Sequence, residues 1–132
     1  MKEDIYESDE QIPLFGHYLF RDVLMNELLG KHKEEILYLL GKSLARKFPL
    51  QTFDEIGDFF AKSGWGNLIL IKEGKKETIY ELQSIYQPYK INPGYELEAG
   101  FLAEQHEQKT GHATEVAVTV KKKRVLFTMK WE

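Results

Sequence analysis

The sequence predicts an α+β domain in which helices pack on one antiparallel sheet. Apolar residues recur at helical spacing between residues 14 and 63, whereas strand-like alternation begins at residue 67. One further helical segment separates two strand pairs, which gives the order αααββαββ. Because helices and strands are clustered by type and neighbouring strands form hairpins, we expect three N-terminal helices and one later helix on about four antiparallel strands.

The composition indicates one packed domain. A chain of 132 residues with 42% hydrophobic and 13% aromatic residues can bury a sizeable core. We expect a flexible tail at residues 1–12 and a single α+β domain at residues 13–132. A formal net charge of −3 provides no general attraction to nucleic acid or to an anionic membrane.

Three features of the sequence favour a cytoplasmic protein without membrane insertion. No apolar run approaches the roughly 20 residues that cross a bilayer. The polar, acidic start MKEDIYESDE lacks the basic beginning and apolar core of a secretory signal. With zero cysteines, the sequence has no disulfide, no thiolate nucleophile and no thiolate metal ligand.

The first two helices follow from their apolar stripes and their ends. Pro13 suits a first helical turn, and helical spacing continues over residues 14–29 until Gly30. The second helix spans about residues 33–47, since Pro49 disfavours the helical conformation of the residue before it.

The third helix begins at a capping box. Thr52 and Glu55 have the spacing at which each side chain bonds the backbone N–H of the other. Apolar residues then recur at helical spacing until Gly64, where the pattern changes.

The second half of the sequence reads as two hairpins around a helix. A turn at residues 73–76 joins the first two strands, and a glycine stops the helix. The predicted ranges are residues 67–71 and 78–85 for the first hairpin, 95–109 for the helix, and 116–120 and 125–131 for the second hairpin.

Three separated sequence blocks resemble the YslB family of uncharacterised bacterial proteins. They are GKSLARKFPL at residues 41–50, Phe59-Phe60 with Gly64-Trp65-Gly66, and LEAGF at residues 97–101 with Ala103-Glu104-Gln105. That family in turn resembles a superfamily of transport-protein-particle subunits, 4-vinyl-reductase-type domains and haem nitric-oxide-binding domains. The resemblance implies a small α+β domain, often dimeric through its N-terminal helices and sometimes holding an apolar ligand.

The sequence departs from these relatives where their chemistry lies. The vinyl-reductase-type domains usually carry cysteines, and the acylated tether subunits attach their chain to a cysteine, but this sequence has none. The haem-binding members need an axial histidine in a helical context that no histidine here matches. The resemblance therefore implies the scaffold without those activities, and we expect no cofactor and no metal.

Gly41 and Gly100 interrupt two predicted helices. A glycine inside a helix costs about 1 kcal/mol relative to alanine, so a close approach to the backbone is expected at each. Either the glycines make room for a ligand or a partner subunit, or they allow close packing within the monomer. Trp65, between two glycines, could likewise floor a pocket or plug the end of the core.

Glu98 shares one predicted helix stripe with apolar residues. A carboxylate in such a place is rarely unpaired, because burying a lone charge is costly. Our hypothesis is a structural ion pair between Glu98 and Arg46 that clamps two helices together.

The sequence best fits a non-enzymatic binding or interaction module, homodimeric through its first two helices. A small apolar ligand would lie in a pocket lined by Phe59, Trp65, Leu82, Phe101 and Leu102. One alternative is a small-metabolite enzyme that uses Glu98 or Glu104 as acid or base, together with a tyrosine such as Tyr95. Another is nucleic-acid binding through the basic run at residues 121–124, although a solvated hairpin turn explains that run as well.

Overall fold

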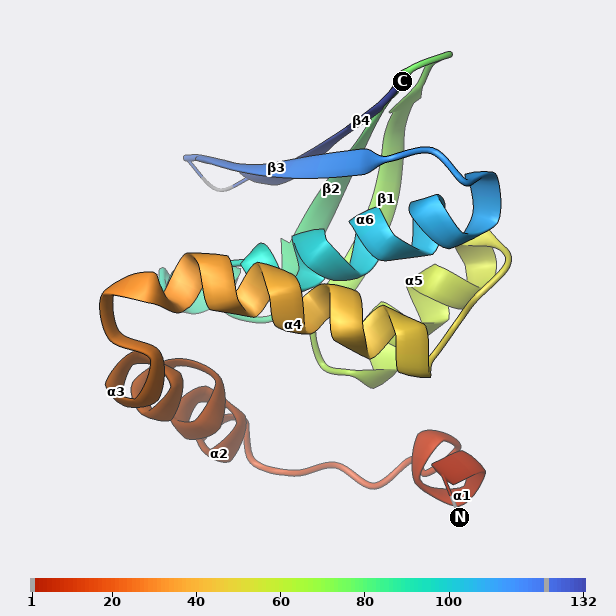
Figure 1. The fold of residues 1–132 in the computed structure, drawn as a ribbon. Coiled ribbons are helices and arrows are strands. Elements are labelled where there is room, and N and C mark those ends of the chain that lie inside the picture. The colour runs from red at the N-terminus through yellow and green to blue at the C-terminus, as the bar shows by residue number, and fades with distance from the viewer. Residues whose placement is uncertain (1, 123) are drawn as a thin grey trace. The chain divides into compact units, whose positions relative to one another are not determined.

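The computed structural model describes residues 2–122 and 124–132, and it confirms the predicted α+β class. Helices and strands follow one another as predicted, with additional short helical segments (Figure 1). In chain order the elements are α1 (Lys2–Tyr6), α2 (Leu14–Tyr18), η1 (Leu19–Leu24), α3 (Met25–Leu29), η2 (Gly30–His32), α4 (Lys33–Lys47), α5 (Phe53–Lys62), β1 (Gly66–Glu73), β2 (Glu77–Ser84), η3 (Gln87–Tyr89), α6 (Glu96–Thr110), β3 (Thr114–Lys121) and β4 (Arg124–Trp131).

The chain divides into two compact units, the N-terminal unit (residues 1–33) and the C-terminal unit (residues 34–132). The sequence predicted a different boundary, between a tail at residues 1–12 and a single domain at residues 13–132. That division stays a prediction. In the N-terminal unit, the helix predicted at residues 14–29 comprises α2, η1 and α3, and η1 has π-helical hydrogen bonding.

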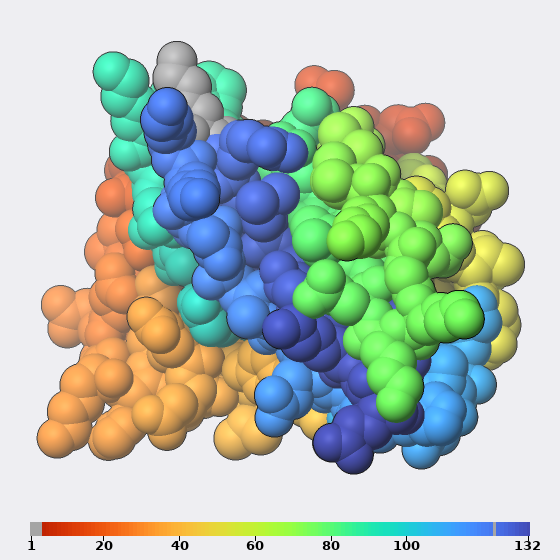
Figure 2. Space-filling model, turned by 90° about the horizontal axis from the view of Figure 1, so that it is seen from above, coloured from red at the N-terminus to blue at the C-terminus, as the bar shows by residue number. Residues whose placement is uncertain are grey.

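The C-terminal unit is built on a four-stranded antiparallel sheet with the strand order β1-β2-β4-β3. Strand β1 pairs with β2 in the first hairpin, and β3 pairs with β4 in the second. The pairing of β2 with β4 joins the two hairpins into one sheet. A β-bulge between Leu70 and Lys72 shifts the register of the edge strand β1. Helix α5 contacts β1 and helix α6 contacts β3 and β4, whereas Figure 2 shows the strands from the opposite face.

Local sequence signals fix the ends of α5 and α6. The predicted capping box is present, because the Glu55 N–H donates to Thr52 Oγ1 (3.1 Å) and the Thr52 N–H donates to Glu55 Oε1 (3.0 Å). At the other end of the unit, Gly111 adopts the left-handed conformation (φ +77°) that ends α6.

Aromatic rings fill the core between the sheet and its helices. Phe60, Phe101 and Phe127 are completely buried. Trp65 packs edge-on against Phe60 with ring centroids 4.9 Å apart and against Phe101 at 5.4 Å, a favourable geometry for aromatic pairs. These rings join the end of α5, the start of β1 and the middle of α6 into one cluster.

Helices α4 and α6 touch backbone to backbone at Gly41 and Gly100. A Cβ atom added to Gly41 would collide with the Leu97 carbonyl oxygen and lie 2.8 Å from the Phe101 nitrogen. A Cβ atom added to Gly100 would collide with the Tyr38 carbonyl oxygen and lie 2.8 Å from its carbonyl carbon. Each helix therefore presents a glycine to the backbone of the other, and any larger residue would separate them.

We predict that Gly100→Ala lowers the free energy of unfolding by about 2–3 kcal/mol, because the added methyl group can be accommodated only by moving backbone. The matched control is Gly57→Ala in α5, where an added Cβ atom would have no neighbour within 4 Å. That control should leave stability unchanged or raise it by up to about 1 kcal/mol. Urea denaturation of both variants measures the difference, and equal stabilities would contradict the helix contact.

Candidate ligand-binding site

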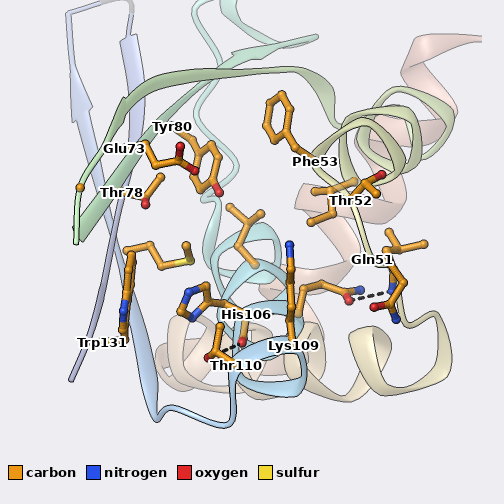
Figure 3. A pocket seen from close by; sticks show the side chains of 16 residues that line it. Gln51, Thr52, Phe53, Glu73, Thr78, Tyr80, His106, Lys109, Thr110 and Trp131 are labelled. Carbon is orange, nitrogen blue, oxygen red and sulfur yellow. Dashed lines mark hydrogen bonds between the residues drawn. The ribbon is translucent and has the colours of Figure 1, made fainter. Parts of the chain in front are cut away.

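A pocket of about 300 Å³ opens within the C-terminal unit, between α5, the end of α6 and the sheet (Figure 3). Five parts of the chain surround it, namely the α4–α5 linker, α5, the β1–β2 hairpin, α6 and β4. Its lining residues are Leu50, Gln51, Thr52, Phe53, Ile56, Glu73, Gly74, Thr78, Tyr80, Leu102, Gln105, His106, Lys109, Thr110, Met129 and Trp131.

The pocket has an apolar floor and aromatic sides. Leu102 and Met129 are both buried and come from α6 and β4. On one side the Phe53 ring stacks on Tyr80, with centroids 5.8 Å apart and planes 7° from parallel. On the other side the ring centroids of His106 and Trp131 lie 4.3 Å apart. Such walls suit a small molecule with an apolar body.

Gln105 fixes the linker that forms one edge of the pocket. Its Oε1 accepts a hydrogen bond from the Leu50 N–H (2.9 Å), and its Nε2 donates to the Phe48 carbonyl oxygen (2.8 Å). The Gln105 side chain is buried, so both bonds are partly shielded from water. One amide from α6 thus satisfies two backbone groups of a segment that has no regular structure.

The hydrogen bonds around His106 determine which ring nitrogen carries the proton. The Thr114 hydroxyl donates its single proton to the His112 carbonyl oxygen (2.8 Å). Thr114 Oγ1 can therefore only accept from His106 Nδ1, which lies 2.9 Å away. The neutral ring consequently carries its proton on Nδ1, and Nε2 has a lone pair available for a hydrogen-bond donor.

Burial shifts the two titratable rings of the pocket toward their neutral forms. Burial, followed by the nearby positive charges of His112 and Lys109, lowers the pKa of His106. Burial, followed by the negative charge of Glu73, raises the pKa of Tyr80.

The residues that the sequence suggested as a ligand pocket are all buried in the core. Phe59, Trp65, Leu82 and Phe101 are buried, and the Phe59 ring stacks on Phe101 with centroids 4.7 Å apart. Leu102 is the member of that set that lines the pocket described above. A ligand at the predicted position therefore stays a prediction, and the pocket opens next to it.

The proposed ion pair between Arg46 and Glu98 is replaced in the structure by one between Arg46 and Glu104. Arg46 Nε lies 3.3 Å from Glu104 Oε2, whereas Glu98 is buried six residues earlier on α6. The reason is the register of the helices. Gly41 meets Leu97 and Phe101 of α6, and Arg46, further along α4, reaches a residue beyond that contact.

Sequence reasoning did not find most of the pocket. His106 and Lys109 lie three residues apart and so share a helix face, a signal that could have been read. Phe53, Tyr80 and Trp131 come from three different elements, and only the packing of α5 and α6 on the sheet brings them to one place.

The other sites considered from the sequence have less support. Within the basic run at residues 121–124, Lys123 lies outside the described residues, and Arg124 Nη2 pairs with Glu81 Oε1 at 2.8 Å. In residues 2–122 and 124–132 no cluster of three or more His, Asp or Glu side chains could hold a metal ion. No helix in this part of the chain has the length and apolarity needed to cross a bilayer.

Comparison with known proteins supports the resemblance seen in the sequence. Residues 14–130 match the family described as "Protein of unknown function (DUF2507)". The protein named "Uncharacterized protein YslB" of Bacillus subtilis (strain 168) is 35% identical over 124 residues, covering 89% of this chain and 84% of that protein. The crystal structure of a vinyl-4-reductase family protein from Methanocaldococcus jannaschii matches with a TM-score of 0.66 and 25% identity, over 99% of this chain and 88% of that chain. Both the YslB likeness and the 4-vinyl-reductase-like fold are thereby confirmed.

We predict that the His106 ring titrates below the ordinary histidine value of about 6.5. Because the folded-state pKa is lowered, the unfolded chain binds the proton more tightly. This residue's contribution to stability is therefore complete above about pH 6.5 and is lost as the pH falls through the lower folded-state pKa.

An NMR titration of the ring proton signals would measure the pKa directly. His106→Gln should make the free energy of unfolding fall less between pH 7 and pH 5 than it does in the unaltered protein. A ring pKa at or above the ordinary value would contradict the predicted direction.

Proposed function

The chain belongs to the DUF2507 family, and we propose that it is a non-enzymatic binding module that holds a small, largely apolar ligand. The ligand site would be the pocket floored by Leu102 and Met129. The observation that carries this proposal is the combination of an apolar floor with polar groups whose positions are fixed by other bonds, as for Gln105 and His106. Specific small-molecule sites combine these two features.

The size of the pocket limits the ligand. One water occupies about 30 Å³ of liquid, so a pocket of about 300 Å³ has room for on the order of ten non-hydrogen atoms. A cytoplasmic location is part of the same proposal and rests on the sequence alone.

An acid–base enzyme is the weaker candidate. Glu104 lies 3.3 Å from Arg46 and 3.9 Å from Lys42, so its carboxylate is part of a structural ion-pair network. Neither Glu98 nor Glu104 lines the pocket around Leu102. No observation at either carboxylate therefore favours a catalytic role.

We also propose a homodimer formed through the first two helices, residues 14–29 and α4. Both helices present large apolar side chains to solvent, and such exposed apolar side chains are available for burial against a second copy. The exposed residues are Phe15, Leu19, Phe20, Val23, Leu24, Leu28, Leu39 and Leu40.

We predict that an uncharged aromatic probe such as toluene shifts one of the two tryptophan indole N–H signals in the NMR spectrum. Trp131 lines the pocket and should respond, whereas Trp65 is in the core and should not. Trp131→Phe assigns the signal by removing it. A probe that shifts neither signal at saturating concentration would overturn the ligand-binding proposal.

We predict that Phe20→Glu and Leu28→Glu each convert the protein to a monomer, because the exposed side chains of Phe20 (65%) and Leu28 (74%) would be buried against a second copy. Native mass spectrometry of freshly purified protein measures the subunit number and any bound small molecule together. The control Lys31→Glu changes an exposed charge in the same unit and should leave the dimer intact. A monomeric unaltered protein would contradict the dimer.

A further inference from the structure

Two opposite charges face the pocket from opposite walls. Lys109 extends from α6, and Glu73 extends from the end of β1 on the hairpin side (Figure 3). The remaining titratable groups of the pocket are His106 on the helix wall and Tyr80 on the hairpin wall. Both have pKa values shifted toward the neutral form, so near pH 7 the pocket carries one positive and one negative charge.

Both charged side chains are exposed to solvent, and the described part of the protein provides neither with an opposite charge. In the part of the chain that the structure describes, Lys109 Nζ and the Glu73 carboxylate form no ion pair and no hydrogen bond with another residue. Comparable side chains nearby do find partners. Glu77 pairs with Lys130 at 3.6 Å across the sheet, and Lys42 pairs with Glu107 at 3.4 Å.

The groups between the charges are of two kinds. Leu102 and Met129 form the apolar floor, and His106 Nε2 offers a hydrogen-bond acceptor because its other nitrogen carries the proton. A ligand that fits this arrangement has a negative end, a positive end with hydrogen-bond donors, and an apolar body. A ligand with a single charge would leave the charged side chain of the opposite wall in contact with water alone.

We propose that the pocket binds a small amino-acid-like zwitterion with an apolar side chain. Its carboxylate faces Lys109, its ammonium group faces Glu73 and His106 Nε2, and its side chain lies over Leu102 and Met129. This inference rests on the proposed function, since it names the ligand class of the same site. Phenylalanine, with twelve non-hydrogen atoms, is of the size that about 300 Å³ accommodates.

Three ligands with one aromatic body separate the contributions of the two charges. L-phenylalanine carries both charges, phenethylamine carries only the ammonium group, and 3-phenylpropionate carries only the carboxylate. Dissociation constants from NMR titration at low ionic strength should be lowest for phenylalanine, by roughly two- to fivefold relative to each of the others, the range expected for a partly exposed ion pair.

Charge-removing variants then assign each end. Lys109→Gln should lower the affinity for phenylalanine and for phenylpropionate roughly two- to fivefold, and it should not change the affinity for phenethylamine. Glu73→Gln should lower the affinity for phenylalanine and for phenethylamine, and it should not change the affinity for phenylpropionate. The controls Lys121→Gln and Glu115→Gln remove exposed charges from β3 outside the pocket and should change none of the three constants.

The outcomes separate this inference from the function on which it rests. Equal affinities for the three ligands, with variants that change nothing, would overturn the zwitterion while toluene binding upheld the apolar site. If toluene bound and none of the three charged ligands did, the zwitterion would likewise be overturned and the apolar site upheld. If neither toluene nor any of the three ligands bound, both the inference and the proposed function would fail.

Discussion

The structure of the C-terminal unit depends on one contact, the backbone-to-backbone approach of α4 and α6 at Gly41 and Gly100. Because each glycine meets the main chain of the other helix, the relative position of the two helices is fixed without intervening side chains. The same register brings Arg46 and Lys42 of α4 to Glu104 of α6. These ion pairs between the two helices therefore follow from the glycine contact and do not determine it.

The helix contact also positions the pocket. Where α4 ends beside α6, Gln105 bonds the backbone of the linker at Phe48 and Leu50, and this linker leads directly into α5. The first residue of α5, Phe53, then stacks on Tyr80 of the sheet. One buried amide thus connects the packing of two helices to the wall of a site on a third.

The sequence predicted the fold well because its signals are local. The Thr52 and Glu55 capping box, the glycine stops and the change from helical to alternating spacing each act within a few residues. The candidate site was less predictable, since Tyr80, Trp131 and Phe53 meet only through long-range packing. The predicted partner of Arg46, Glu98, was wrong for the same reason, because the apolar stripe of one helix does not reveal the register between two helices.

The bulge between Leu70 and Lys72 has a consequence for the protein in a crowded solution. Strand β1 lies at one edge of the sheet, where unpaired backbone groups could template the addition of a foreign strand. A bulge breaks the regular spacing of those groups, so an incoming chain cannot pair along the full length of the edge. The irregularity of β1 therefore discourages self-association into fibrils while leaving the central hydrogen-bond ladder intact.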